Sequence, residues 1–294
     1  MVSLEEAKAA NNQANLAGKR ALLVGGSSGC GKGLALVLSR LGCKITIVGR
    51  NEERGAAAAA EITAASPSNE TCEFIVCDVR LFANIKEACA KITASHESLD
   101  ILSLSCTRGG IQGYRPTSEG HDERLMSMYL GRWAWVHALK PLLLKSADPR
   151  VLSILSSGKH KPHAAWQSDF LTVKCGPAGR TSAAGWYNDC ACSALARQHP
   201  SLTTVHIYPG FVRTNWYLEL PPGLRGLTKM LMRTGKPLEE CGEFMAVGMV
   251  QPAYASGCYL RTEFAEAEKP TRLFDDATCD AVWAKTLELY ERHL

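Results

Sequence analysis

The sequence lacks any uninterrupted apolar segment long enough to cross a bilayer, and residues 1–17 are polar and alanine-rich without the apolar centre of a signal peptide. It also lacks a long basic run, and its net charge is only +4. We therefore expect a cytoplasmic protein that binds neither membranes nor nucleic acids. Charged residues at 21% and hydrophobic residues at 46% are ordinary values for a folded chain and argue against disorder.

Clustered cysteines are also missing, although the chain contains 12 of them. Cys190 and Cys192 form the one close pair, and no C-x-x-C occurs. Because a zinc site needs clustered ligands, the sequence predicts no metal centre. The spacing of His160 and His163 would suit a metal, but no third ligand accompanies them. The favoured interpretation of the cysteines is free, buried thiols in a reducing compartment.

What is present is a short apolar run, Ala21 to Val24, that stops at glycines before helix-forming residues resume at Leu34. This pattern predicts a strand, a tight turn and a helix. Gly25 permits the turn, Gly29 lets the backbone approach a ligand, and Gly31 lets helix and strand pack closely. The free N–H groups and positive dipole end of the helix face the turn, where a pyrophosphate can bind.

Strand and helix patterns then alternate to the end of the chain, which implies a right-handed, doubly wound parallel sheet. We expect an N-terminal helical extension at 1–17, where Ser3 and Glu6 form a capping-box pattern, and a single α/β domain at 18–294. About seven strands are expected, at 21–24, 44–49, 72–78, 99–105, 150–156, 202–208 and 255–262. Helices are expected at 32–41, 51–65, 82–94, 122–144, 183–198 and 277–294, with an amphipathic helix pair at about 215–240.

The residues after the second predicted strand indicate which dinucleotide is bound. An acidic side chain at this strand end accepts hydrogen bonds from the adenosine ribose and repels a 2′-phosphate. Here the acid is absent, and Arg50 and Asn51 follow Gly49 instead. Because a guanidinium suits phosphate, we expect NADP(H) rather than NAD(H). The alternative is a solvated arginine at a strand end.

Two spaced motifs resemble the fingerprints of the short-chain dehydrogenase/reductase family, and the resemblance covers about residues 18–262. They are Gly25-x-x-x-Gly29-x-Gly31 and Pro209-Gly210-x-x-x-Thr214. The resemblance implies a three-layer Rossmann fold, an NADP(H) cofactor and a homodimer or homotetramer. The chain looks most like fungal members with a degenerate active site. The cofactor-binding residues implied by the resemblance are Gly25, Ser27, Ser28, Gly29, Cys30, Gly31, Arg50, Asn51, Asp78, Val79, Ser105, Cys106, Pro209, Gly210, Val212 and Thr214.

The family's catalytic Tyr-x-x-x-Lys motif is absent from the chain. In the family the tyrosine exchanges a proton as the hydride moves, the lysine lowers the pKa of the tyrosine, and a serine on the fifth strand holds the carbonyl oxygen. Ser156 or Ser157 matches that serine. Thirteen residues beyond Ser157, Phe170 to Lys174 resembles the motif without its hydroxyl. Counting back from Pro209 points to 178–182 instead, which also lacks the pair.

Other polar side chains could replace the missing proton donor. Tyr129 or Arg132, on the long predicted helix, could face the pocket, and the alternative for Tyr129 is a place in the core. His160, His163 and Asp169 follow the fifth strand, and each could act as an acid or base near neutral pH. The alternative for these three is a solvated loop position. The catalytic candidates are Ser156, Ser157, Lys174, Tyr129, Arg132 and Asp169.

The leading hypothesis is an NADP(H)-dependent oxidoreductase that acts on a carbonyl or alcohol of an apolar small molecule, such as a secondary metabolite, with a substituted proton relay. In the family, the segment at about 215–240 lies over the substrate. One alternative is a non-redox enzyme that keeps the cofactor pocket, of the cyclase, isomerase or Diels–Alderase type. The other is a catalytically silent NADP(H)-binding protein.

Overall fold

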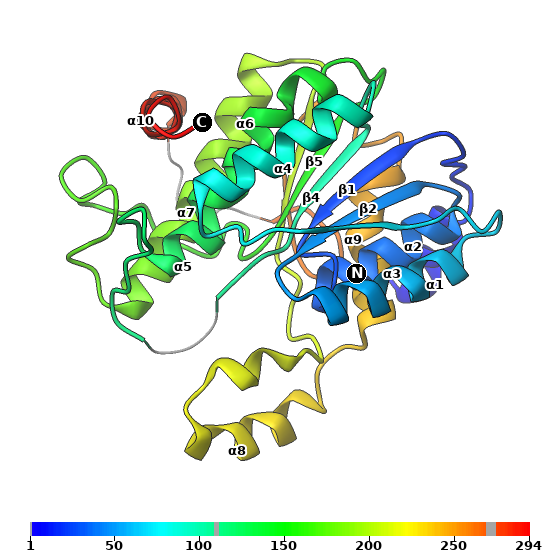
Figure 1. Cartoon of the computed structure of the whole chain (residues 1–294), viewed down its shortest axis with the longest axis horizontal. Coiled ribbons are helices and arrows are strands. Elements are labelled where there is room, and N and C mark those ends of the chain that lie inside the picture. The colour runs from blue at the N-terminus through cyan, green and yellow to red at the C-terminus, as the bar shows by residue number, and fades with distance from the viewer. Residues whose placement is uncertain (1, 109–111, 269–274) are drawn as a thin grey trace.

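One parallel sheet of seven strands, in the order β3-β2-β1-β4-β5-β6-β7, forms the centre of the molecule (Figure 1). The computed structural model describes residues 2–108, 112–268 and 275–294. The strand order confirms the predicted doubly wound fold, in which the chain builds outward from β1 in both directions. The strands are β1 (Arg20–Val24), β2 (Lys44–Gly49), β3 (Glu73–Val76), β4 (Ile101–Leu104), β5 (Arg150–Ile154), β6 (Thr203–Ile207) and β7 (Gly257–Arg261).

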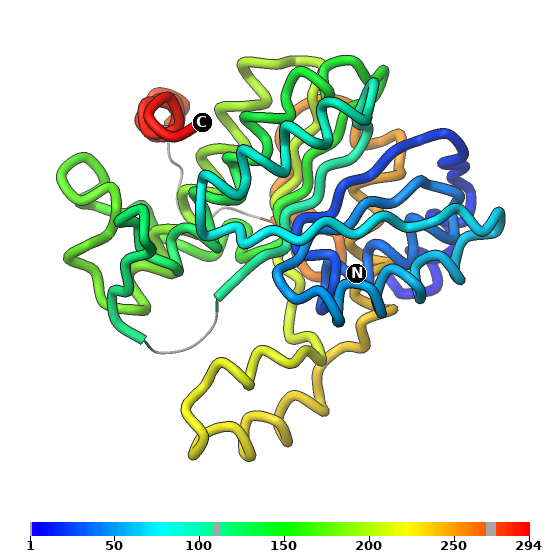
Figure 2. The backbone as a smooth tube through the Cα atoms, viewed as in Figure 1, coloured from blue at the N-terminus to red at the C-terminus, as the bar shows by residue number. Residues whose placement is uncertain are grey.

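Helices cover both faces of the sheet, and the tube view shows these layers (Figure 2). On one face lie α1 (Leu4–Asn11), α2 (Gly29–Arg40), α3 (Glu52–Ala65) and α9 (Leu238–Val250). On the other lie α4 (Phe82–Ser95), α6 (Gly131–Leu143) and α7 (Pro177–Gln198), with α10 (Asp276–Tyr290) packed on α7. The remaining helices are α5 (Glu123–Leu125), the π-helical turn η1 (Met126–Leu130), the 3₁₀-helix η2 (Asn215–Glu219) and α8 (Pro222–Met232).

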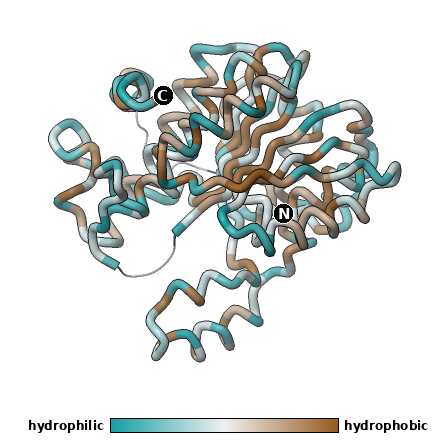
Figure 3. Tube along the Cα trace, viewed as in Figure 1, coloured by the Kyte–Doolittle hydropathy of each residue, from teal (hydrophilic) through white to brown (hydrophobic). Residues whose placement is uncertain are grey.

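The strands are apolar on both faces because each face is covered by helices. In β1, Leu22 packs into the layer of α4 and α6, and its neighbour Leu23 packs into the layer of α2 and α9. Both side chains are buried, as the period-two geometry of a strand requires. The hydropathy view accordingly shows the most hydrophobic stretches in the central strands (Figure 3). Among the described residues, no helix combines the length and the apolar character that crossing a membrane requires.

The structure corrects three of the predicted helices. The predicted helix at 183–198 begins earlier, at Pro177, because proline suits the first helical position. The predicted long helix at 122–144 is interrupted by the π-helical turn η1. The predicted helix pair at 215–240 is a 3₁₀-helix followed by α8, and α9 then starts at Leu238.

The N-terminal extension packs on α9. Ser3 caps α1 through the expected capping box with Glu6. At the other end of α1, the buried Asn11 amide donates to the carbonyl oxygen and to the carboxylate of Glu243, each at 2.9 Å. Arg40 of α2 also binds the Glu243 carboxylate at 2.9 Å. The extension is therefore joined to the domain through a buried acid of α9.

Helices α2 and α9 cross in backbone contact at two glycines. A Cβ atom at Gly242 would overlap the carbonyl oxygen of Gly33, and one at Gly33 would overlap the carbonyl oxygen of Leu238. Both overlaps are with backbone, which cannot rotate away as a flexible side chain can. The crossing therefore sets the position of α2, whose N-terminus faces the cleft described below.

We expect Gly242→Ala to lower the free energy of unfolding by about 1–3 kcal/mol, because the added methyl group forces α2 and α9 apart. Urea denaturation of the full chain measures this change. The matched control is Gly223→Ala in α8, where an added Cβ meets no atom within 4 Å. A Gly242→Ala protein as stable as the Gly223→Ala protein would contradict the close crossing.

Candidate functional site

A cleft of about 780 Å³ opens at the carboxyl ends of β1, β2, β4 and β5. This is the edge at which open α/β sheets bind ligands, at the point where the strand order reverses. Thirteen of the sixteen residues predicted to bind a cofactor line it. They are Gly25, Ser27, Ser28, Gly29, Cys30, Arg50, Asn51, Asp78, Val79, Ser105, Cys106, Pro209 and Thr214.

The other three predicted cofactor residues are not in its wall. Gly31 packs beneath it, where a Cβ atom would overlap the Ser105 hydroxyl. Gly210 has a φ of +74° and packs against Glu263, and Val212 is buried and pairs with Lys236. These three residues shape the backbone around the cleft and do not form its surface.

The glycine turn leaves room and hydrogen-bond donors for an anion. Gly25 and Gly29 have φ values of +93° and +57°, which a residue with a Cβ adopts only under strain. Ser28 is the N-cap of α2, yet its side chain makes no hydrogen bond to the first turn. The N–H groups of that turn therefore point toward the cleft without a side-chain partner, and they fit a diphosphate.

The end of β2 carries cations and has no room for an acid. A Cβ atom at Gly49 would lie 2.6 Å from the hydroxyl oxygen of Ser27, so the serine already occupies this space. Arg50 and Arg54 are exposed and line the cleft beside it. The Asn51 side chain caps α3 by accepting from the backbone N–H of Arg54 at 2.8 Å. Two guanidinium groups therefore flank the position that an acid would occupy in an NAD-binding site.

A chain of alternating charges borders the neighbouring part of the cleft. Arg80 donates to Asp78 at 2.9 Å and to Glu123 at 2.9 Å, and Arg108 also binds Glu123 at 2.9 Å. Burial by itself would raise the pKa of Asp78, but the hydrogen bonds from Arg80 bring it below its usual value. Asp78, which the family resemblance places at the adenine, is therefore held ionised by Arg80.

Two polar side chains meet just after β5. The Ser156 hydroxyl and Nε2 of His160 lie 2.8 Å apart. On α7, a Cβ atom at Gly185 would overlap the His160 ring and would lie 2.8 Å from the Ser156 hydroxyl. The imidazole therefore fills the space that a side chain at 185 would need. Burial lowers the pKa of His160, so its ring is mainly neutral at pH 7.

The other candidates from the same region have structural contacts. The Ser157 hydroxyl is buried and accepts from the backbone N–H of Arg261 at 3.2 Å. The Asp169 carboxylate accepts from the backbone N–H groups of Val173 at 2.8 Å and Lys174 at 3.1 Å. The Lys174 side chain is exposed and is not part of the cleft wall. Lys174 therefore does not take the place of the family lysine.

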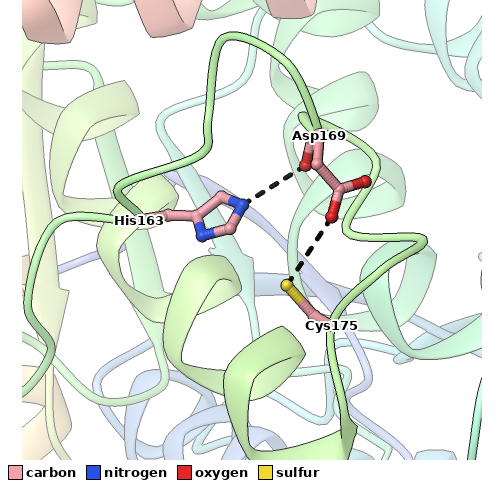
Figure 4. A group of neighbouring side chains, drawn as sticks. All are labelled: His163, Asp169 and Cys175. Carbon is pink, nitrogen blue, oxygen red and sulfur yellow. Dashed lines mark hydrogen bonds between the residues drawn. The ribbon is translucent and has the colours of Figure 1, made fainter.

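Asp169 forms a cluster with His163 and Cys175 (Figure 4). The possible ligand atoms of the three residues lie within 4.8 Å of one another, so the cluster could hold a metal ion. Each group already has a hydrogen bond in the structure. The Cys175 thiol donates to the Asp169 carboxylate at 3.8 Å, and His163 Nε2 lies 3.3 Å from the Asp169 carbonyl oxygen. These contacts fold the loop after β5 back on itself.

Tyr129 and Arg132 do not face the cleft, contrary to the hypothesis from the sequence. Tyr129 is fully buried, and its hydroxyl lies 2.6 Å from the Thr286 hydroxyl of α10. Burial raises the pKa of Tyr129 far above its ordinary value, which prevents it from releasing a proton. Arg132 is fully buried beneath the cleft floor and donates to the carbonyl oxygens of Leu104 and Ile154 at the ends of β4 and β5.

Sequence reasoning missed a buried histidine–aspartate contact behind β5. Nδ1 of His206 on β6 lies 2.6 Å from the carboxylate of Asp189 on α7, and both side chains are buried. Asp189 also accepts from the backbone N–H of Gly158 at 3.1 Å. The pair thereby supports the turn that carries Ser156. No local sequence signal links two residues that lie on different elements.

Comparison with known proteins decides the family. A model described as short chain dehydrogenase matches residues 19–219. The chain belongs to the short-chain dehydrogenase family. The match includes the glycine turn and Thr214, and therefore most of the cleft described above, and it also includes Ser156 beside the cleft.

Two fungal oxidoreductases are among the similar curated proteins. Oxidoreductase andH of Emericella variicolor is 34% identical over 197 residues, which are 66% of this chain and 58% of the relative. Oxidoreductase AN1596 of Emericella nidulans is 32% identical over 228 residues, 74% of this chain and 66% of the relative. The chain thus spans less than two thirds of each relative. The human dehydrogenase/reductase SDR family member 13 is 26% identical to this chain, and the aligned region covers 98% of this chain and 77% of the human protein.

Solved structures agree on the fold of this short-chain dehydrogenase. A Serratia marcescens short-chain dehydrogenase/reductase mutant superposes with a TM-score of 0.65 at 20% identity, covering 86% of this chain and 99% of the other. A metagenomic short-chain oxidoreductase in complex with NADP gives a TM-score of 0.61 at 19% identity, covering 84% and 98%. Identities this low support the fold and carry no conclusion about substrate.

We expect Tyr129→Phe to lower the free energy of unfolding by about 1 kcal/mol, the usual contribution of one buried hydrogen bond. Dinucleotide affinity should stay the same, because the hydroxyl contacts α10 and not the cleft. Thermal unfolding and a binding titration of the same protein measure both quantities. A loss of dinucleotide affinity without a loss of stability would contradict this placement of the hydroxyl.

Proposed function

We propose that the protein is an NADP(H)-dependent oxidoreductase that interconverts an alcohol and a carbonyl on an apolar small molecule. The observation that carries the proposal is the contact between Ser156 and His160 at the end of β5, beside a cleft suited to a dinucleotide. Membership of the short-chain dehydrogenase family supports the reaction class. The contact supplies a hydroxyl and a titratable group where the family's tyrosine and lysine are missing.

The cleft residues support NADP(H) as the cofactor. The N–H groups at the start of α2 would hold the diphosphate, and Ser27, Arg50 and Arg54 would hold the 2′-phosphate. Thr214 would bind the nicotinamide carboxamide, as the family resemblance implies. The solved metagenomic relative in complex with NADP agrees with this assignment. When bound, the dinucleotide would supply or accept the hydride.

The proton path in this proposal runs through two side chains. In alcohol oxidation, the substrate O–H donates to the Ser156 hydroxyl, the serine proton passes to Nε2 of His160, and the C–H bond breaks with departure of a hydride. The neutral imidazole that burial favours is the form that can accept this proton. In carbonyl reduction the same path runs backward, and protonated His160 is the donor. Asp189 stabilises the turn between the two residues by binding Gly158.

Apolar side chains beside the cleft favour an apolar substrate. Trp216 and Leu218 of η2 line the cleft and are partly exposed. The next helix, α8, extends away from the sheet (Figure 1) and exposes Leu227 and Leu231. These side chains would cover an apolar molecule, such as a fungal secondary metabolite. The two fungal relatives are named as oxidoreductases, which supports the reaction class of the proposal.

Arg50→Ala should weaken NADPH binding on the order of tenfold and leave NADH binding nearly unchanged, because only NADPH carries a phosphate for this guanidinium. Calorimetric titration with both dinucleotides measures the two affinities. Arg292→Ala, which removes an exposed arginine near the C-terminus, is the matched control and should change neither. An equal loss for both dinucleotides would contradict a phosphate contact.

His160→Gln should lower kcat on the order of 100-fold or more while NADPH affinity stays constant, because glutamine hydrogen-bonds Ser156 without titrating. His163→Gln is the control and should keep kcat, since His163 contacts a backbone carbonyl oxygen. The measurement uses whichever apolar alcohol in a panel reduces NADP⁺ fastest.

The pH profile provides a second readout of His160. Because burial lowers its pKa below the ordinary 6.5, alcohol oxidation should rise with pH through a value below 6.5 and stay level at neutral pH. The rate of carbonyl reduction should fall with rising pH through the same value, because protonated His160 is the proton donor. A profile unchanged by His160→Gln would exclude this proton path. Tight NADPH binding without any hydride transfer across the panel would instead favour the non-redox alternative.

A further inference from the structure

Arg132 places a guanidinium directly behind the cleft floor. Its side chain has no exposed surface, and it begins in the first turn of α6. All of its hydrogen-bond acceptors are neutral oxygens. They belong to Leu104, Cys106, Ser127, Ser153 and Ile154.

The charge of Arg132 has no acidic partner among the described residues. The other fully buried arginine, Arg180, lies 3.5 Å from the carboxylate of Asp122, whereas no described carboxylate comes within ion-pair distance of Arg132. Burial lowers the pKa of Arg132 to about 10, which still leaves it protonated at pH 7. Burial also raises the pKa of the Cys106 thiol to about 11, so this neighbour is neutral. Such a lone buried charge is costly to maintain.

The residues that accept hydrogen bonds from Arg132 form part of the cleft wall. Cys106, Ser127 and Ile154, whose carbonyl oxygens bind the guanidinium, also line the cleft. The pKa of Cys30, in the glycine turn, is lowered first by a hydrogen bond with Cys241, and the charges of Lys236 and Arg132 lower it further. The guanidinium of Arg132 therefore lies one carbonyl group behind the cleft wall, in a position where water cannot screen its charge.

The two oxidation states of a nicotinamide differ in charge, because the oxidised ring is a cation and the reduced ring is neutral. The family resemblance places this ring between Thr214 and Ser156. We infer that the buried charge of Arg132 makes the cleft bind the reduced dinucleotide more tightly than the oxidised one and tilts the bound pair toward hydride acceptance. This inference rests on the proposed function. It agrees with a neutral His160, which is ready to take the proton of an alcohol.

The balance of the step is that of alcohol oxidation. A bound oxidised dinucleotide would accept the hydride released when the alcohol C–H bond breaks, and Ser156 would pass the O–H proton to His160. The charge of Arg132 would then favour the product state, in which the dinucleotide has lost its ring charge. One unscreened charge at such a site changes relative affinity on the order of tenfold. A tenfold preference for the reduced form raises a two-electron midpoint potential by about 30 mV.

The test compares the dissociation constants of NADP⁺ and NADPH for the full chain at pH 7. The natural protein should bind NADPH about tenfold more tightly than NADP⁺. Arg132→Met should remove most of this preference, and Arg132→Lys, which keeps the charge but not the fork of hydrogen bonds, should retain most of it. Arg180→Met, which removes a buried arginine with an acidic partner, should leave the ratio unchanged. The midpoint potential of the bound NADP⁺/NADPH pair, measured with a redox dye, should be lower in Arg132→Met, in step with the smaller preference for NADPH.

Three outcomes would overturn the inference. One is a natural protein that binds NADP⁺ as tightly as NADPH, a result that needs no variant and so stands even if the substitutions prevent folding. Another is a ratio that changes equally in the Met and Lys variants, which would make Arg132 a structural residue only. The last is a ratio that is unchanged in Arg132→Met. Absence of binding by either dinucleotide would instead contradict the proposed function itself.

Discussion

One buried guanidinium joins the elements that form the centre of the cleft. Arg132 donates to carbonyl oxygens at the ends of β4 and β5 and in the π-helical turn η1. Parallel strands leave such carbonyl groups without partners where they end, and a buried carbonyl group needs a donor. A neutral amide offers two N–H groups, whereas a guanidinium offers five in a rigid fork. The cleft floor is thus held together by a cation that has no carboxylate partner among the residues that the structure describes.

A second constraint is the close packing of the loop after β5 against α7. Gly185 has no side chain, and the His160 ring lies in the gap that this leaves. This packing brings a titratable group to 2.8 Å from Ser156, although the chain has no Tyr-x-x-x-Lys motif. In the proposed function, the contact between Ser156 and His160 takes the part of the family's tyrosine and lysine. The fold is that of the short-chain dehydrogenase family.

Local patterns were sufficient for the sheet and for the phosphate end of the cleft. The apolar runs of the strands and the glycines at 25, 29 and 31 act through backbone geometry over a few residues, so the pattern carries the information directly. Helix boundaries were less accessible. The segment before residue 183, which includes Gly179, was predicted to be irregular, yet α7 already begins at Pro177 because tertiary packing supports a weak helix former.

The direction in which each polar side chain points was decided only in three dimensions. Tyr129 and Arg132 lie three residues apart on one predicted helix, but Tyr129 belongs to the π-helical turn η1 and Arg132 to the first turn of α6. Tyr129 consequently packs on α10 and Arg132 reaches the strand ends. The sequence alone therefore determined the fold, the glycine turn and the cations at β2, which depend on neighbours along the chain. The tertiary structure decided which hydroxyl meets which imidazole and where a charge is buried, because those contacts join residues from separate elements.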